Sequence, residues 1–157
     1  MATTRPLSHS LRTATLNDQT YIEHLQRQHT NALGFVPRAA ITDHIARHNY
    51  TILTVNGQDA AYALHGGGLL RPYRLVQCAV TDELWRLGYG RALIEHALAR
   101  ARTRRYSDTV VTVRDRLLMN AVCLNLGATL TATTHPRTSR KLPLHHYRFV
   151  QTPTLFD

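Results

Sequence analysis

The sequence is poor in cysteine and has no long apolar runs. Its 157 residues contain two cysteines, Cys78 and Cys123, and neither belongs to a CxxC pair. Free cysteines are usually small buried side chains, so we expect reduced thiols rather than a disulfide or a metal site. No segment approaches the roughly 18 apolar residues of a membrane-spanning helix. The N-terminal residues also lack the apolar core of a secretory signal, which predicts a cytoplasmic protein with no membrane partner.

Acidic residues are scarce as well. Ten Asp and Glu stand against nineteen basic residues, which gives a formal net charge of +9, and only one of the nineteen is Lys. This excess of positive charge indicates an anionic partner, either nucleic acid or an anionic small ligand. Hydrophobic residues make up 43% of the sequence. A chain of this length and apolar content is expected to form one folded domain over residues 1–157, with its core at about 11–150.

The remaining pattern is an alternation of β-rich and amphipathic segments. We predict strands at 11–15, 50–55, 59–65, 75–80, 109–113, 128–134 and 145–150, and helices at 18–33, 37–48, 91–105 and 115–126. Asn56-Gly57 is a strong hairpin signal between two of these strands. The order β-α-α-β-β-β-α-β-α-β-β predicts an α/β domain with one mixed, mostly antiparallel sheet between two layers of helices.

The most informative stretch joins the strand at Val76–Val80 to the helix that begins at Arg91. The turn between them contains Gly88 and Gly90, separated by Tyr89. A helix N-terminus has backbone N–H groups without intrahelical partners, and the helix dipole adds partial positive charge there. Glycine also lets a ligand approach the backbone closely. The turn is therefore predicted to bind an anion such as phosphate.

This arrangement resembles the GNAT superfamily of acyl-CoA-dependent N-acyltransferases, most specifically over VQCAVTDELWRLGYGRALIEHAL. The family's pyrophosphate loop begins with Arg or Gln, where this chain has Trp85. The resemblance implies acetyl-CoA or another acyl-CoA as co-substrate. It also implies that the cofactor contacts the strand residues and the loop, namely Cys78, Ala79, Val80, Arg86, Leu87, Gly88, Tyr89, Gly90 and Arg91.

A second similar stretch is VTVRDRLLMNAVCLNLGA. Asn120 precedes Gly127 by seven residues, a spacing seen in some GNAT members. Many members carry, four residues before this glycine, a Tyr that protonates the departing CoA thiolate. Cys123 occupies that position here, and it is more simply explained as a small buried side chain. The general acid is therefore not assigned.

Three residues are candidates for catalysis: Asp115, Asn120 and His65. Asp115 follows a strand near the expected cleft, although it can equally cap the next helix. His65 ends another strand, and a neutral His is a natural base near pH 7, although a structural role is an alternative. The ten histidines do not form a matched ligand set, so no metal site is predicted.

Basic residues form two groups in the sequence. Arg100, Arg102, Arg104 and Arg105 end a helix, where the dipole favours cations. Arg137, Arg140, Lys141 and Arg148 lie in and beside the last hairpin loop, which often borders the acceptor groove in GNAT folds.

The first functional hypothesis is the transfer of an acetyl or small acyl group to a primary amine whose identity is open, on a substrate that can be anionic. The alternative is a GNAT-like protein that modifies nucleic acid, as phage DNA-modification proteins of the Mom type do, or an inactive basic nucleic-acid-binding module. A homodimer also remains open.

Overall fold

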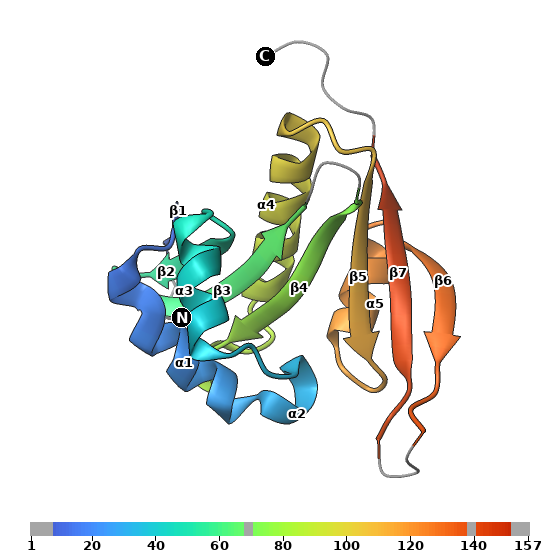
Figure 1. Ribbon diagram of the computed structural model, residues 1–157, viewed down its shortest axis with the longest axis horizontal. Helices are drawn as coiled ribbons and strands as arrows, with labels where there is room; N and C mark the ends of the chain where they lie inside the picture. The colour runs from blue at the N-terminus through green and yellow to red at the C-terminus, as the bar shows by residue number, and fades with distance from the viewer. Residues whose placement is uncertain (1–7, 68–70, 138–140, 152–157) are drawn as a thin grey trace, which may run out of the picture.

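One seven-stranded sheet organises the chain in the computed structural model, which describes residues 8–67, 71–137 and 141–151 (Figure 1). The strand order is β1-β2-β3-β4-β5-β7-β6. The strands are β1 His9–Thr13, β2 Tyr50–Val55, β3 Gln58–Gly66, β4 Tyr73–Val80, β5 Asp108–Arg114, β6 Thr129–Thr134 and β7 Leu144–Val150. All neighbours pair antiparallel except β4 and β5, which are parallel. The predicted mixed, mostly antiparallel sheet is confirmed.

Helices cover both faces of this sheet, as predicted. They are α1 Gln19–Gln28, α2 Thr30–Leu33, α3 Arg38–Ala46, α4 Tyr89–Thr103 and α5 Met119–Asn125. Helices α1 and α3 lie on the face toward the viewer in Figure 1, here called the front, and α4 and α5 lie on the back. Within the described residues, no helix is long and apolar enough to cross a membrane.

Two apolar clusters hold the three layers together. On the front, Ile22 and Ile41 pack with Ile52 of β2. On the back, Leu93 of α4 packs with Leu53 of the same strand. Successive strand residues point to opposite faces, so a strand covered on both faces needs apolar residues throughout. This explains why the β2 sequence YTILTV is buried at five of its six positions.

Several predicted boundaries were wrong. His29 divides the single helix expected at 18–33 into α1 and α2. The helix expected to start at Asp115 starts at Met119 instead, and Leu118 occupies its N-cap position. Asp115 is therefore not the helix cap.

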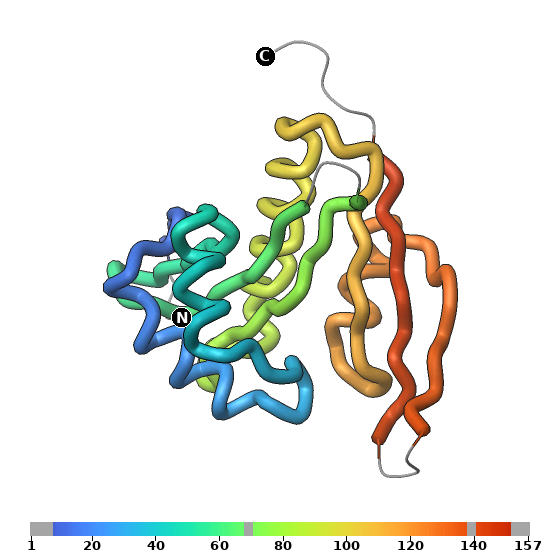
Figure 2. Tube along the Cα trace, viewed as in Figure 1, coloured from blue at the N-terminus to red at the C-terminus, as the bar shows by residue number. Residues whose placement is uncertain are grey.

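Strand β4 contains a bulge at Val76. Leu64 of β3 pairs with Gln77 and His65 pairs with Leu75, so Val76 is an extra residue on β4. A bulge bends its strand and changes which residues face each side. Beyond this point β4 and β5 separate: their ladder holds only three pairs, the last joining Leu75 to Val111. Figure 2 shows the two strands together at the upper end of the view and apart at the lower end.

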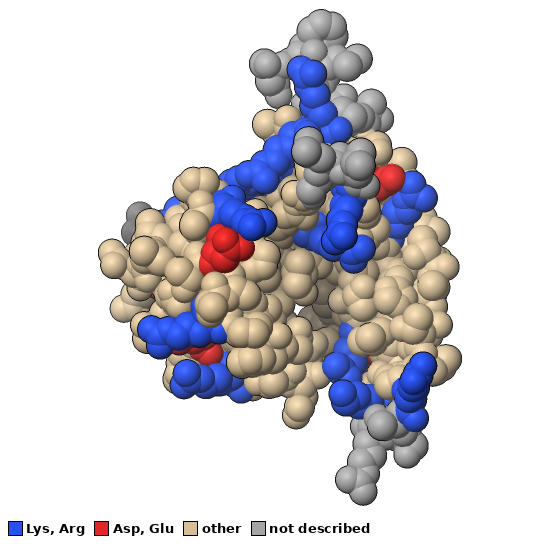
Figure 3. Space-filling model, viewed as in Figure 1, with Lys and Arg blue, Asp and Glu red and all other residues tan. Residues whose placement is uncertain are grey.

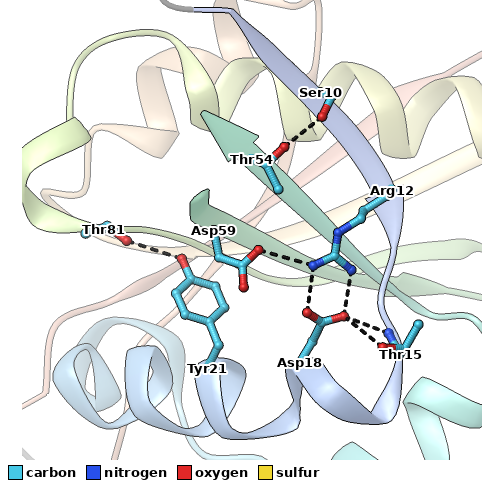
Figure 4. A network of polar contacts seen from close by, with 8 residues as sticks. All are labelled: Ser10, Arg12, Thr15, Asp18, Tyr21, Thr54, Asp59 and Thr81. Carbon is cyan, nitrogen blue, oxygen red and sulfur yellow. Dashed lines mark hydrogen bonds and ion pairs between the residues drawn. The ribbon is translucent and has the colours of Figure 1, made fainter. Parts of the chain in front are cut away.

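A polar network fastens the start of α1 to strands β1 and β3 (Figure 4). Arg12 of β1 donates two hydrogen bonds of 2.7 Å to Asp18, just before α1, and one of 3.1 Å to Asp59 of β3. The guanidinium holds the pKa of the Asp18 carboxyl below its usual value. Farther along α1, the Tyr21 hydroxyl lies 3.2 Å from Thr81 Oγ1, one residue after β4. The end of β4 is thus held against the front helices.

Candidate active site

The turn between β4 and α4 presents a set of free backbone donors. Gly88, the N-cap of α4, has a φ of 88°. The first backbone hydrogen bond of the helix is the one that the Ala92 N–H donates to the Gly88 carbonyl at 3.0 Å. Before that bond, the N–H groups of residues 86–91 meet no backbone acceptor among the described residues. With a 15-residue helix behind them, these donors give the N-terminal end of α4 a geometry that favours an anion.

The two arginines of the loop differ in their surroundings. Arg91 Nε lies 3.1 Å from Glu95 one helical turn later, which offsets part of its charge. Arg86 has no ion pair within the described part of the chain, and it adopts a φ of 62°. This left-handed conformation is uncommon for a residue with a side chain. The loop therefore supplies one unpaired guanidinium beside its free N–H groups.

Trp85 fixes the start of this loop. Its indole N–H donates to the Val80 carbonyl at 2.7 Å, which ties the loop to the end of β4. Its ring lies 5.4 Å, centroid to centroid, from the ring of His29 between α1 and α2. His29 Nε2 in turn lies 3.2 Å from Asp82 Oδ1. Trp85 thus holds the loop through an indole hydrogen bond and a ring contact, at the position where GNAT proteins carry Arg or Gln.

The separation of β4 and β5 opens a cleft beside the loop. Residues from both strands and from the segments that flank the opening line it, namely Ala32, Leu33, Leu75, Val76, Gln77, Cys78, Val111, Thr112, Val113, Leu117 and Met119. The hollow between the two halves of the sheet is visible in Figure 3. Because the β4–β5 ladder ends at Leu75, the edge of β4 beyond it offers backbone groups to a ligand in this cleft.

A row of hydroxyls and one imidazole crosses the front face next to the cleft. Thr112 Oγ1, in the cleft wall, lies 3.0 Å from His146 Nδ1. His146 Nε2 lies 3.0 Å from Thr134 Oγ1 on the edge strand β6. Each ring nitrogen therefore has a hydroxyl partner, and a neutral imidazole accepts from one hydroxyl and donates to the other. In the sequence, His146 was considered only as one of ten histidines for a metal site, so this row was not predicted.

Asp115 has a different partner on the opposite face. Its Oδ1 lies 2.9 Å from His145 Nε2, and His145 Nδ1 lies 3.0 Å from Thr133 Oγ1. A carboxylate only accepts, so Nε2 carries the proton and Nδ1 accepts from the Thr133 hydroxyl. The hydrogen bond from His145 lowers the pKa of Asp115 below its usual value. Neither Asp115 nor His145 lines the cleft described above.

Three comparisons with known proteins bear on this geometry. The sequence matches no protein-family model and no curated protein sequence. Many solved structures do match the fold. Ard1 from Thermoplasma volcanium superposes with a TM-score of 0.79 at 18% identity, over 92% of this chain and 98% of that one. The ribosomal-protein-S18-alanine N-acetyltransferase of Escherichia coli gives 0.75 at 20% identity, over 96% and 97%.

A third similar structure is yncA from Salmonella typhimurium, solved with its cofactor acetyl-CoA. Its TM-score is 0.75 at 17% identity, over 96% of this chain and 98% of that one. The chain has the GNAT fold. The resemblance that the sequence suggested is confirmed at the level of the fold, over nearly the whole described chain.

In this GNAT fold, Asn120 holds the start of α5. Its side-chain amide donates to the Arg114 and Leu117 carbonyls at 2.9 Å each, and its oxygen accepts from the Tyr147 hydroxyl at 2.7 Å. These bonds occupy the polar atoms of the side chain within the fold. They fix the segment between β5 and α5 that forms one wall of the cleft.

Cys123 is fully buried in the back cluster. Burial raises the pKa of its thiol to about 11, and that of Cys78 to about 12. Both thiols are therefore protonated near neutral pH. A thiol at that pKa is a weak donor, and Cys123 lies against apolar neighbours, which agrees with the predicted packing role.

His65 lies in the core at the other end of β3 from the loop. It is 1% exposed, Nε2 lies 2.8 Å from Thr51 Oγ1, and Nδ1 contacts the Tyr73 hydroxyl. Burial, aided by the charge of nearby arginines, lowers its pKa to about 3. His65 pairs with Leu75 before the bulge, so the structure does not bring it together with the loop or with Asp115.

Proposed function

We propose that this protein transfers an acetyl or other small acyl group from acyl-CoA to a primary amine. The observation that carries the proposal is the pairing of two features. The free N–H groups of residues 86–91 stand at the start of α4, and the unpaired edge of β4 leads away from them into the cleft. An elongated ligand with a pyrophosphate at one end and an amide-containing arm at the other matches both.

The loop would hold the pyrophosphate of CoA through the N–H groups of Arg86, Leu87, Gly88, Tyr89, Gly90 and Arg91. The Arg86 guanidinium adds charge to the same anion. The pantetheine arm carries amides that can pair with the open edge of β4, along Cys78, Ala79 and Val80, as an added strand would. The Val80 carbonyl is excepted, because it already accepts the Trp85 indole N–H. The arm would end near the bulge at Val76, which places the thioester inside the cleft.

The reaction joins the amine nitrogen to the thioester carbonyl carbon, and the bond from that carbon to sulfur then breaks. The developing oxyanion needs donors, and backbone N–H groups on the open edge of β4 beyond the bulge are the donors that we assign to it. The departing CoA sulfur leaves as a thiolate and takes a proton. No side chain is assigned to deliver it, because the usual Tyr position holds the buried Cys123.

We assign the acceptance of the amine proton to His146, acting through Thr112. Thr112 lines the cleft and lies 3.0 Å from His146 Nδ1. The Thr112 hydroxyl can receive a proton from the amine while passing its own to the ring nitrogen. Asp115, Asn120 and His65 are the candidates from the sequence. Of these, Asp115 and Asn120 remain as residues that shape the segment after β5, through His145 and Tyr147.

Acetyl-CoA binding is the first test. Purified protein should melt at a higher temperature in acetyl-CoA, with a stabilisation of about 2.7 kcal/mol when the ligand stands at a hundred times its Kd. Release of free CoA in the presence of a panel of amines then reports turnover. No thermal shift at millimolar acetyl-CoA would overturn the proposal and favour the inactive binding module instead.

A further inference from the structure

A basic groove lies at the end of the sheet farthest from loop 86–91. Its walls are the segment before β4, the segment that follows α4, and the front face of β5, β6 and β7. Its residues, here called the arginine groove, are Arg71, Pro72, Arg104, Arg105, Tyr106, Ser107, Asp108, Val110, Thr131 and Arg148. Figure 3 shows Lys and Arg side chains gathered at this upper end of the front face.

Carboxylates of the described residues do not balance the charges of the arginine groove. Arg148 donates to Asp108 at 2.6 Å. Arg71, Arg104 and Arg105 have no carboxylate within 4.0 Å among the described residues. Four guanidinium groups thus share one carboxylate. An unpaired Arg offers a planar fork of donors that matches a phosphate.

Strand register extends the charged surface by one more residue. Arg74 of β4 pairs with Val110 of β5, and Val110 pairs with Arg148 of β7. Paired residues in a sheet point to the same face. Arg74 and Arg148 therefore flank Val110 on the front face, which places Arg74 beside the groove as a fifth arginine.

The backbone around the groove is held in place. The Tyr106 N–H donates to the Ala101 carbonyl at 2.9 Å as α4 ends. The Gln151 N–H donates to the Ser107 carbonyl at 2.8 Å, which joins this turn to the end of β7. The backbone of Arg104 and Arg105 therefore belongs to a hydrogen-bonded turn, so binding of an anion by these two arginines needs little ordering of the main chain there.

The groove continues into the cleft. Val110 lines the groove and Thr112 lines the cleft, and the two residues stand on the same face of β5, about 7 Å apart at the usual rise of a strand. His146 and Arg148 repeat this spacing on β7. All six residues of β6 are exposed, and no helix covers this half of the front face in Figure 1. A ligand in the groove can thus extend past His146.

We propose that the arginine groove binds the phosphodiester backbone of a single-stranded nucleic acid. A single phosphate is satisfied by one or two arginines, whereas five surround this groove, spaced along and across the strands. The uncovered face beside them carries hydroxyls that can bond a backbone or bases. Its occupant is therefore a chain of phosphates rather than one. Binding of this kind does not depend on the proposed acyl transfer.

Fluorescence anisotropy with a labelled 20-nucleotide oligothymidylate tests the proposal. The logarithm of the affinity should fall linearly with the logarithm of salt concentration, with a slope of about −0.7 for each phosphate contacted, or near −3 for four contacts. The variant Arg71→Gln with Arg104→Gln should bind at least tenfold more weakly and lose about 1.4 units of slope.

The matched control is Arg27→Gln with Arg47→Gln. It removes the same charge from α1 and from the end of α3, away from the groove, and should change affinity less than twofold. Equal losses in the two variants would overturn the proposal, because only net charge would then matter. Displacement of the probe by polyglutamate as readily as by unlabelled oligonucleotide would also overturn it, in favour of an acidic polypeptide. Displacement of the probe by millimolar inorganic phosphate would overturn it as well, because the groove would then bind a single anion rather than a chain of phosphates.

Both variants should keep their melting temperature and their response to acetyl-CoA, since Arg71 and Arg104 touch neither the loop nor the cleft. This control separates the two proposals. Oligonucleotide binding without an acetyl-CoA response would support the proposal for the arginine groove and overturn the proposed acyl transfer. An acetyl-CoA response without oligonucleotide binding would do the reverse.

Discussion

The two ends of the β4–β5 pair present different chemical groups, main-chain N–H groups at one end and arginine side chains at the other. At the end where the strands separate, the proposed anion site consists of backbone N–H groups from one continuous loop, residues 86–91. At the end where the strands pair, the arginine groove consists of side chains from the turns before β4 and after α4 and from β7. One site is local in sequence and made of main chain. The other is dispersed and made of side chains.

The difference matters for substitution. A backbone site tolerates changes of side chain, and here the bond from the Trp85 indole to the Val80 carbonyl holds the form of the loop. It is sensitive instead to changes of backbone conformation. A side-chain site responds to each guanidinium that is removed, in steps, without loss of the fold.

The largest expected effect lies in the cleft between the two ends. His146→Gln should lower kcat by about 10²- to 10⁴-fold with little change in the KM for acetyl-CoA, the usual range for loss of a general base. His145→Gln is the matched control, because it is the adjacent residue and faces the opposite side of the sheet. It should lower kcat less than about threefold. If His145→Gln is the more damaging change, the base is the Asp115–His145 pair.

A smaller effect is expected in the loop. Gly88→Ala should weaken acetyl-CoA binding about tenfold, because a left-handed φ costs a residue with a Cβ about 1–2 kcal/mol. The new Cβ meets no protein atom within 4 Å, so it would stand where the ligand approaches. Isothermal titration calorimetry measures the change.

Gly90→Ala is the companion variant. Its Cβ would lie 3.5 Å from Met119 Cε, an ordinary contact, and Ala is the better helix former. Acetyl-CoA affinity should fall less than in Gly88→Ala. If Gly90→Ala lowers the affinity more than Gly88→Ala does, the donors that matter most lie in the first turn of α4 rather than in the loop. Arg71→Gln with Arg104→Gln should leave this affinity unchanged.

The smallest expected effect is a pH dependence of stability, and it arises from His65 at the end of the sheet where the arginine groove lies. Burial lowers the pKa of His65 in the folded state to about 3, well below the ordinary value of 6.5. Below pH 6.5 the unfolded chain therefore binds the proton first, and stability falls as the pH is lowered. Between pH 6.5 and 5.5 the free energy of unfolding should fall by about 1 kcal/mol. Burial also lowers the pKa of the neighbouring His96, which adds to the same loss of stability. Urea unfolding at both pH values measures it, and His65→Gln should flatten the dependence.

Much of the fold could be predicted from the sequence, because its signals are local. The alternation of strands and helices, the Asn56-Gly57 hairpin and the strand–glycine turn–helix unit each depend on residues close together in the chain. Boundaries were less accurate where tertiary contacts decide them. Asp115 had the sequence signal of a helix cap, but the imidazole of His145, thirty residues away, is its partner.

The candidate site divides in the same way. The loop was predicted because glycine spacing is visible in a sequence. His146 was missed because its partners lie on two other strands, and nothing in the dipeptide His145-His146 says that the two rings face opposite sides of the sheet. The grouping of arginines also changed. Arg104 and Arg105 were assigned to a helix end, and Arg148 to the last loop, but all three line one groove. Arg140 lies outside the described residues.

The sequence by itself determined that a strand, a glycine turn and a helix would present free N–H groups at one turn, since helix ends carry such donors wherever they occur. Only the tertiary structure decided that the bulge at Val76 would open a cleft beside them, that Thr112 would meet His146, and that arginines from separate segments would share one groove. Those features depend on strand order and register, which bring together residues that the chain itself keeps apart.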